Sequence, residues 1–245
     1  MDVNFDTKYL YVMGAESGAG KSTVCLGILA QLLASGFTAD QLAYIKPVTQ
    51  CVAKQPVALF CEQRQVSCRE IGSLTFKKGF SKDFIDGLTP GPDALLAEVL
   101  ATIHTISKGK TVVIIDGVGD PSVGSVVGVS NVTVALSLSC SVIFVGKPGI
   151  GAAIDSTVLC VSFMQLNGLR DIGIIYNKIP QAVMPEIKKH LTKRLPELLP
   201  EVTLLGFIGN VNDSANIEHN FDAFIDRKML LFDWLKLTKY NRLII

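Results

Sequence analysis

Short apolar runs alternate along this chain with longer stretches in which apolar residues recur at helical spacing. The runs are rich in β-branched residues, which is typical of strands that are buried on both faces of a sheet. They cover Tyr9–Met13, Leu42–Ile45, Val112–Ile115, Val142–Val145, Ile172–Tyr176 and, as a sixth, Val202–Ile208. The helical stretches cover Ser22–Ala34, Pro92–Ile106, Val129–Leu138, Ile154–Leu166 and Pro185–Leu195. This alternation predicts an α/β fold with a doubly wound parallel sheet and helices on both faces.

Two segments do not follow this alternation. Residues 54–87 are less regular, and we interpret them either as an excursion that carries substrate contacts or an interface, or as a solvated insertion. Residues 221–245 carry apolar positions at the spacing of an amphipathic helix, which would dock on its own domain or on a dimer partner. Because the sequence contains no Pro/Gly-rich linker and no internal repeat, we predict a single domain over residues 1–245.

The composition excludes several classes of partner. Hydrophobic residues make up 49% of the 245 positions, enough for a large core, and the net charge is +1 without runs of like charge. A nucleic acid or an acidic membrane surface is therefore not expected as a partner. No charged residue occurs between Asp120 and Lys147, a window longer than the ~20 residues that a bilayer requires. Its many serines and glycines instead predict a loop, a buried helix and a buried strand.

The cysteines suggest neither a zinc site nor a redox pair, because no C-x-x-C motif occurs and no histidine lies at ligand spacing. We expect them to be buried small hydrophobic residues in a reducing compartment; they are Cys25, Cys51, Cys61, Cys68, Cys140 and Cys160. The first residues lack the basic and apolar regions of a secretory signal. The expected location is therefore the cytoplasm.

A glycine-rich turn, Gly14-Ala-Glu-Ser-Gly-Ala-Gly20-Lys21-Ser22, follows the first predicted strand and opens the first predicted helix. In this context Gly-Lys-Ser indicates a phosphate-binding loop, because backbone N–H groups and the helix N-terminus converge on one point. Lys21 would bind the outer phosphates, and Ser22 would bind Mg²⁺. The predicted nucleotide contacts are Gly14, Glu16, Ser17, Gly18, Ala19, Gly20, Lys21, Ser22 and Thr23.

The spacing of this loop is a variant of the usual pattern, since five residues rather than four separate Gly14 from Gly20. The position five residues before Lys21 is occupied by Glu16. Partition and septum-site ATPases carry a second, signature lysine there. The sequence therefore disfavours those dimeric switches.

A second motif, Thr111-Val-Val-Ile-Ile-Asp116-Gly-Val-Gly119, is an apolar strand that ends in a carboxylate. Such a carboxylate lies opposite the phosphate loop, where it can hold Mg²⁺ directly or through water. Gly117 and Gly119 would let the backbone pass close to a ligand. Asp120 would face the same cleft or only solvent.

Two other strand ends carry candidate residues. Lys46 follows the second strand and would either neutralise charge on a transferring phosphate or be an ordinary surface lysine. Asn177 ends the fifth strand and would contact adenine or simply form a turn. Guanine-specific proteins use Asn-Lys-x-Asp there, whereas this chain has Pro180 in the Asp position. ATP is therefore expected rather than GTP.

These residues resemble the dethiobiotin synthetase-like P-loop proteins over residues 9–210. The resemblance rests on Gly14–Ser22, Lys46-Pro47-Val48, Asp116-Gly-Val-Gly119, Gly124-Ser-Val-Val-Gly128, Asn177-Lys178 and Leu205-Gly206. It implies that ATP phosphorylates a carbamate formed from a diamine and CO₂, and that ring closure yields a cyclic urea. It further implies Lys21 and Lys46 as catalytic residues, Ser22 and Asp116 as Mg²⁺ ligands, and Asn177 at the adenine. We expect a homodimer with a small-molecule substrate.

The chain departs from the synthetase pattern on the acceptor side. Asp116 replaces a Glu, Gln50 and Cys51 replace small residues, and Ile154-Asp155 replaces an Asn-His pair. Nucleotide handling is thus expected to be preserved while the diamine pocket is rebuilt, with a possible substrate cleft formed by Thr49, Gln50, Gly117, Gly119 and Asp120. Two functions follow: an ATP-dependent ligase, or a nucleotide-sensing regulatory module that binds ATP without turnover.

Overall fold

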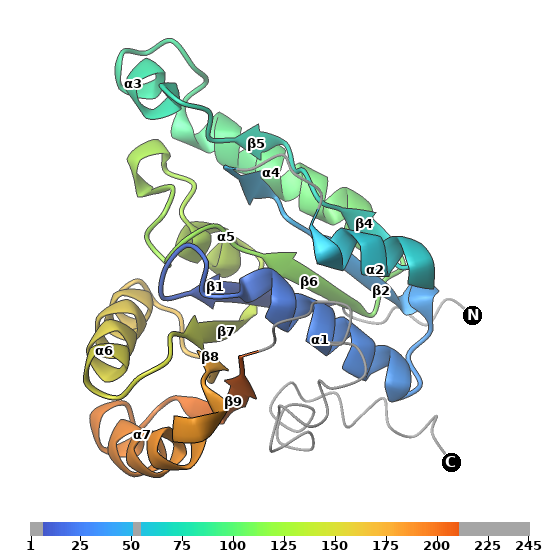
Figure 1. The fold of residues 1–245 in the computed structure, drawn as a ribbon. Coiled ribbons are helices and arrows are strands. Elements are labelled where there is room, and N and C mark those ends of the chain that lie inside the picture. The colour runs from blue at the N-terminus through green and yellow to red at the C-terminus, as the bar shows by residue number, and fades with distance from the viewer. Residues whose placement is uncertain (1–6, 51–54, 211–245) are drawn as a thin grey trace.

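The computed structural model describes residues 7–50 and 55–210, and a seven-stranded sheet runs through them (Figure 1). All neighbouring strands pair in parallel. The spatial order is β4 (Ser67–Arg69), β2 (Leu42–Ile45), β6 (Val112–Asp116), β1 (Lys8–Gly14), β7 (Ser141–Gly146), β8 (Ile172–Ile179) and β9 (Thr203–Gly209). The predicted doubly wound parallel sheet is confirmed, with one strand more than the six predicted.

Helices cover both faces of this sheet, as predicted. Successive strand residues point to opposite faces, so Leu10 and Val12 of β1 pack on one side, whereas Tyr11 and Met13 pack on the other. The first side is covered by α1 (Lys21–Ala34) and α2 (Pro56–Arg64). The second is covered by α4 (Pro92–Ser107), α5 (Asn131–Ser137), α6 (Gly151–Leu166) and α7 (Met184–Leu198).

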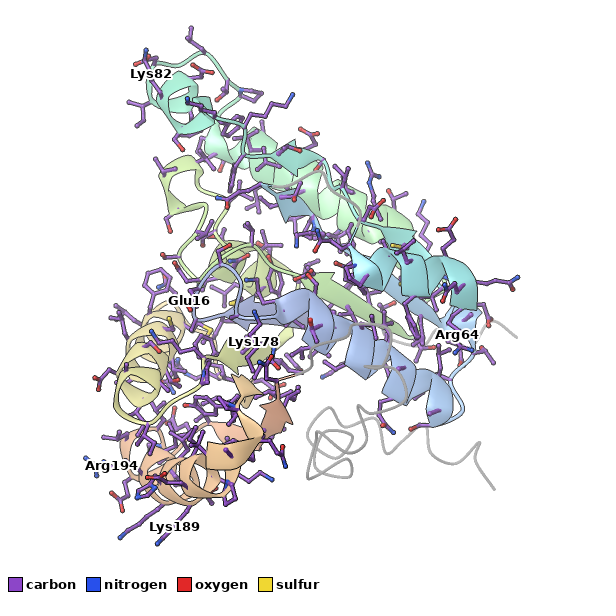
Figure 2. The ribbon with its side chains drawn as sticks, viewed as in Figure 1. Glu16, Arg64, Lys82, Lys178, Lys189 and Arg194 are labelled. Carbon is purple, nitrogen blue, oxygen red and sulfur yellow. The ribbon has the colours of Figure 1, made fainter. Side chains whose placement is uncertain are left out.

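Helix α7 illustrates how the sequence periodicity builds these layers. Ile187, Leu191 and Leu195 recur every fourth residue and are buried against the sheet, and burying each side chain contributes roughly 1.5–3 kcal/mol. Lys189 points away from the sheet on the opposite side of the helix (Figure 2). The hydrophobic stripe therefore decides which face of α7 meets the core.

The uncharged window between Asp120 and Lys147 forms the predicted loop, helix and strand. A 3-10 turn (Ser125–Val127) precedes α5 and β7. Helix α5 begins at Asn131 rather than at Val129, because the Ser130 hydroxyl accepts a hydrogen bond from the Thr133 amide at 3.0 Å and caps the helix. Within the described part of the chain, no helix has the length and apolar character needed to cross a membrane.

The described part of the segment 54–87, residues 55–87, is more regular than the sequence suggested. Helix α2 buries Val57, Phe60 and Cys61 on the same face as α1, and β4 joins the main sheet as its edge. A second, two-stranded sheet pairs β3 (Val48–Thr49) with β5 (Leu74–Thr75), and the short α3 (Phe80–Ile85) follows. Part of this segment therefore completes the sheet instead of leaving it. The helix expected at 221–245 lies outside the described residues.

The cysteines only partly match the expectation of burial. Cys25, Cys61 and Cys140 are buried, whereas Cys160 is half-buried and Cys68 is exposed; Cys51 lies outside the described residues. The expectation was wrong for Cys68, because β4 pairs with β2 on one side only and forms the edge of the sheet.

Candidate nucleotide site

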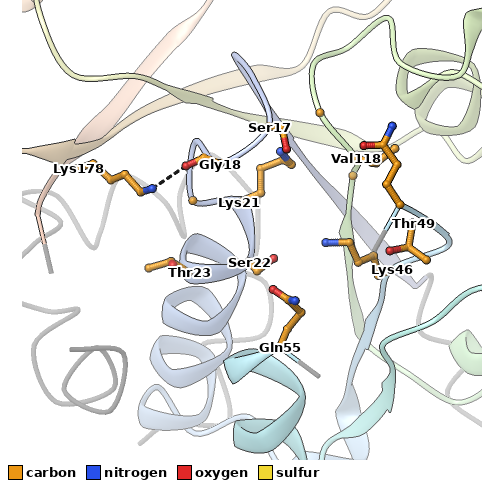
Figure 3. A pocket seen from close by; sticks show the side chains of 14 residues that line it. Ser17, Gly18, Lys21, Ser22, Thr23, Lys46, Thr49, Gln55, Val118 and Lys178 are labelled. Atoms are coloured by element: carbon orange, nitrogen blue, oxygen red, sulfur yellow. Dashed lines mark hydrogen bonds between the residues drawn. The ribbon is translucent and has the colours of Figure 1, made fainter. Parts of the chain in front are cut away.

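The predicted motifs meet at the carboxyl edge of the sheet, beside β1. Strands β6 and β2 lie on one side of β1, and β7, β8 and β9 lie on the other, so the chain reverses its winding direction here. Ligands of open α/β sheets bind at such a point. A cavity of about 330 Å³ lies there (Figure 3). It is lined by Ser17, Gly18, Gly20, Lys21, Ser22, Thr23, Lys46, Thr49, Gln50, Gln55, Gly117, Val118, Gly119 and Lys178.

The loop between β1 and α1 is held from behind by β8. Asn177 donates from Nδ2 to the Ala19 carbonyl at 3.0 Å, and Lys178 donates from Nζ to the Gly18 carbonyl at 2.7 Å. Gly20 has a φ of +93°, and a Cβ there would lie 2.1 Å from Asn177 Nδ2. Only glycine fits this close approach. The loop shape is therefore set by packing against β8.

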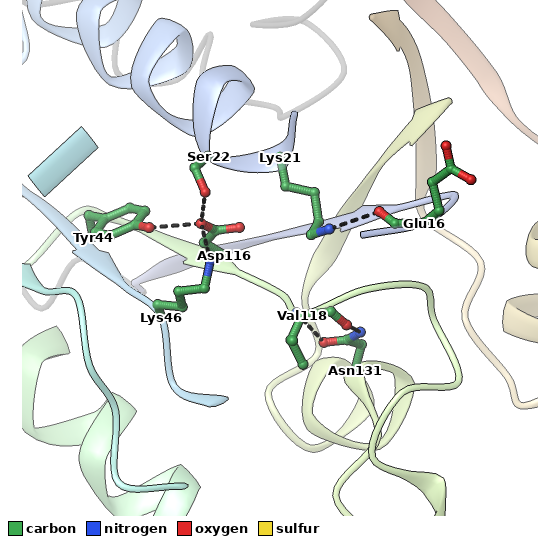
Figure 4. A network of polar contacts seen from close by, with 8 residues as sticks. All are labelled: Glu16, Lys21, Ser22, Tyr44, Lys46, Asp116, Val118 and Asn131. Carbon is green, nitrogen blue, oxygen red and sulfur yellow. Dashed lines mark hydrogen bonds and ion pairs between the residues drawn. The ribbon is translucent and has the colours of Figure 1, made fainter. Parts of the chain in front are cut away.

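The first turn of α1 is available to an anion. Helix α1 begins at Lys21, and no side chain caps it, so its first N–H groups lack intrahelical partners. Lys21 is only 7% exposed and donates to the Glu16 carbonyl at 3.2 Å (Figure 4). Burial lowers the pKa of its ammonium group, with Asp116 opposing this shift and Lys46 adding to it. A bound phosphate would supply the negative charge that this buried cation lacks.

Asp116 is the most constrained polar residue of the site. It is fully buried, and its Oδ2 accepts from Ser22 Oγ at 2.6 Å, Tyr44 OH at 2.8 Å and Lys46 Nζ at 3.2 Å (Figure 4). Its Oδ1 is also buried but has no hydrogen-bond partner among the described residues. An unsatisfied buried carboxylate oxygen is unfavourable. This oxygen and the Ser22 hydroxyl are hard donors that fit Mg²⁺.

Tyr44 belongs to this network although no sequence motif contains it. Burial raises the pKa of its phenol, and the neighbouring Asp116 raises it further. The hydroxyl thus remains protonated and donates to the carboxylate. Tyr44 lies in β2, next to β6, so only the strand order reveals its role.

Asn131, at the start of α5, fixes the loop that follows β6. Its Oδ1 accepts from Tyr11 OH at 3.0 Å and from the Val118 amide at 3.2 Å, and its Nδ2 donates to the carbonyls of Val118 at 2.7 Å and Asp120 at 2.6 Å. It is almost fully buried. A Cβ on Gly117 would lie 2.8 Å from Asn131 Oδ1. Asn131 therefore sets the path of the loop that lines the cavity.

The predicted site residues divide into three groups. Those that line the cavity are Ser17, Gly18, Gly20, Lys21, Ser22, Thr23, Lys46, Thr49, Gln50, Gly117 and Gly119. Those outside this lining, in the loop or at the ends of β1, β6 and β8, are Gly14, Glu16, Ala19, Asp116 and Asn177. Asp120 instead lines a second cavity of about 310 Å³ with Ala15 and residues of α6. Its Oδ1 accepts from the Ser122 amide and hydroxyl.

Three residues of the cavity lining had no place in the predicted site. Gln55 immediately precedes α2, Val118 lies between two predicted glycines, and Lys178 follows Asn177. Lys178 belongs to the Asn177-Lys178 motif but not to the predicted site residues. Its φ of +59° marks the point where β8 departs from regular pairing with β9, and this bulge orients its side chain.

Comparisons with known proteins place the chain in a family. A family model described as an AAA domain matches residues 8–218, and this family covers the dethiobiotin synthetases. The ATP-dependent dethiobiotin synthetase BioD of Aquifex aeolicus (strain VF5) is 24% identical over 200 residues, which cover 79% of this chain and 89% of that protein.

Solved structures share the fold at lower identity. The MinD cell division protein of Aquifex aeolicus aligns with a TM-score of 0.57 at 12% identity, covering 95% of this chain and 97% of that chain. A ParA family ATPase from Chlorobium tepidum TLS aligns with a TM-score of 0.51 at 13% identity, covering 88% of each chain. The chain therefore belongs to the AAA domain family that covers the dethiobiotin synthetases, as a dethiobiotin synthetase-like P-loop NTPase.

Proposed function

We propose that the protein binds ATP with Mg²⁺ and uses it to phosphorylate a carbamate formed from an amine acceptor and CO₂, closing a cyclic urea. The observation that carries this proposal is the convergence of Lys21, Ser22 and Lys46 at one cavity, with Ser22 and Lys46 both bonded to the buried Asp116. The similarity to a protein named ATP-dependent dethiobiotin synthetase supports the choice of reaction class.

Each of these residues has a role in the proposed reaction. Lys21 and the first turn of α1 would bind the outer phosphates. Ser22 and Asp116 would hold Mg²⁺, which supplies charge neutralisation at the phosphate oxygens. A carbamate oxygen would attack the terminal phosphorus as ADP leaves, and the second amine would then attack the carbamoyl carbon as phosphate leaves. Lys46 would stabilise the negative charge that develops at the transferring group.

The charge of the cavity is suited to these anions. Lys21, Lys46 and Lys178 are its charged lining residues within the described part of the chain, and all three are cations. Lys46 is 15% exposed and pairs with the fully buried Asp116, so its ammonium group reaches the cavity from a fixed position. Such a cavity favours a polyphosphate and an anionic carbamate over a free amine.

A second candidate function is a nucleotide-sensing module that binds ATP without turnover. It is favoured by the position of Asp120, which lines a separate cavity rather than the nucleotide cavity, and by Gln50, which occupies a lining position where small residues were expected. For either function we propose a cytoplasmic homodimer with a small-molecule ligand. The molar mass in solution tests the oligomeric state.

Phosphate release separates the two functions. The protein is incubated with ATP, Mg²⁺, bicarbonate and 7,8-diaminopelargonate, and then with a panel of other amines and carboxylates. Lys46→Ala should reduce turnover more than ATP affinity, because its charge acts chiefly on the transferring group. Lys46→Arg retains the charge and is the matched control. Measurable ATP affinity without phosphate release on any acceptor would support the sensing module.

A further inference from the structure

A pair of thiols lies at the edge of the sheet, and neither cysteine lines the nucleotide cavity. Cys61 is fully buried in α2, and Cys68 is exposed in β4. Cys68 is the register partner of Tyr44 in β2, so both side chains point to the same face of the sheet. Tyr44 and Cys61 belong to the core on that face. Helix α2 and β4 contact one another on that face, and a side-chain hydrogen bond with Cys68 is the largest influence on the pKa of Cys61.

The backbone between the two cysteines holds this pair in place. Helix α2 ends at Gln65, which adopts a left-handed conformation with a φ of +58°. The Val66 amide then donates to the Cys61 carbonyl at 2.9 Å. This tight return brings β4 directly beside the helix that it follows. The local fold therefore places the helix that carries Cys61 beside the strand that carries Cys68.

The two thiols differ in access to solvent. The hydrogen bond with Cys68, followed by burial, raises the pKa of Cys61, so this thiol is a poor initial nucleophile. Cys68 is exposed at the edge of the sheet, where a dissolved oxidant can reach it. An exposed thiol beside a second, resolving thiol is the arrangement of redox-sensing cysteine pairs.

We propose that Cys61 and Cys68 form a reversible dithiol–disulfide couple, a site of oxidative modification by peroxides. The Cys68 thiolate attacks one peroxide oxygen, so its sulfur is oxidised to a sulfenic acid while the O–O bond breaks and hydroxide leaves. The Cys61 sulfur then attacks the Cys68 sulfur, which releases water and forms the S–S bond. In total, two thiols lose two hydrogens and one hydrogen peroxide becomes two waters.

The test uses the folded full-length chain, which is treated with hydrogen peroxide, alkylated and mapped by mass spectrometry after proteolysis. We expect a Cys61–Cys68 disulfide that forms within one chain and is reversed by dithiothreitol. Cys68→Ser should leave Cys61 reduced, and this exposed position tolerates serine. Cys160→Ser is the matched control, because burial raises the pKa of that half-buried thiol to about 11 and it has no role in the pair.

Three outcomes would overturn the proposal. Cys68 could oxidise to a sulfinic acid while Cys61 stays reduced, which would show that the thiols cannot reach bonding distance. Cys68 could pair with Cys51 or with another chain. The disulfide could also form equally well in urea-unfolded protein, which would show that the fold does not select the pair. None of these measurements depends on nucleotide binding or turnover.

Discussion

Replacing Asp116 by Asn separates the metal-dependent part of nucleotide binding from the rest. The amide keeps the shape of the carboxylate and removes its charge. With Mg²⁺ present, ATP should bind more weakly, because the cation loses a charged ligand. Without Mg²⁺, ATP should bind as well or better, because a negative charge near the polyphosphate has gone and Lys46 is left without its partner.

The size of the effect follows from the distances in the site. Ser22 Oγ lies 2.6 Å from Asp116 Oδ2, so a cation bound to Ser22 would lie within about 4 Å of the carboxylate charge. Mg²⁺ carries two charges, so its attraction to the carboxylate at that separation is roughly 8 kcal/mol at an effective dielectric constant of about 20. Lys46 already offsets part of this attraction. If a third remains, about 2.8 kcal/mol, the ratio of ATP affinities with and without Mg²⁺ falls about 100-fold.

Calorimetric titration of the protein with ATP, once in a buffer that contains Mg²⁺ and once in a buffer that contains EDTA, measures this ratio. Asp120→Asn is the matched control, because Asp120 lines the other cavity and its substitution should leave both affinities unchanged. Thermal unfolding confirms that both variants are folded. An equal loss of affinity in the two buffers would refute the reasoning and show that Asp116 has a structural role only.

Three further predictions address the phosphate loop and the base. Lys21→Ala should weaken ATP binding by roughly 10- to 100-fold, the value of one charged hydrogen bond, without unfolding the chain; unchanged affinity in calorimetry would contradict the phosphate-loop assignment. In a displacement assay the affinity for ATP should equal or exceed the affinity for GTP, because Pro180 provides no carboxylate that could bind guanine. A strong preference for GTP would show that another loop supplies such a carboxylate. Gly20→Ala should lower unfolding stability by more than Gly18→Ala in urea titrations. Both glycines have a positive φ, which costs a non-glycine residue roughly 1–2 kcal/mol, but only a Cβ at position 20 meets Asn177.

The sequence predicted those elements whose signals are local. The β1 strand, its glycine-rich turn and the start of α1 are contiguous, and Asp116 directly ends an apolar run. The strand β4 was not predicted because it has only three residues and none is fully buried. So short and exposed a strand shows no alternation of hydrophobic and polar residues. Its place in the sheet depends on pairing with β2, which no local pattern encodes.

The supporting residues of the site could not be found in the same way. Asn131 and Tyr11 are separated by 120 positions, and Tyr44 and Asp116 by 72. Each pair meets only because of the order of the strands and helices. The thiol pair illustrates the same limit. Six residues separate Cys61 from Cys68 in the sequence, which matches no C-x-x-C motif, and only a helix end and a tight return bring the two together.

The carboxylate of Asp116 also has a consequence for the lifetime of the protein. Three donors from separate parts of the chain immobilise one of its oxygens during folding, so little side-chain entropy remains to be lost when a ligand arrives. The other oxygen is buried without a hydrogen-bond partner among the described residues, which destabilises the ligand-free protein. Ligand binding then stabilises the native state by mass action. In a cell, proteases would clear the empty protein faster than the loaded one, so its abundance would follow the supply of nucleotide.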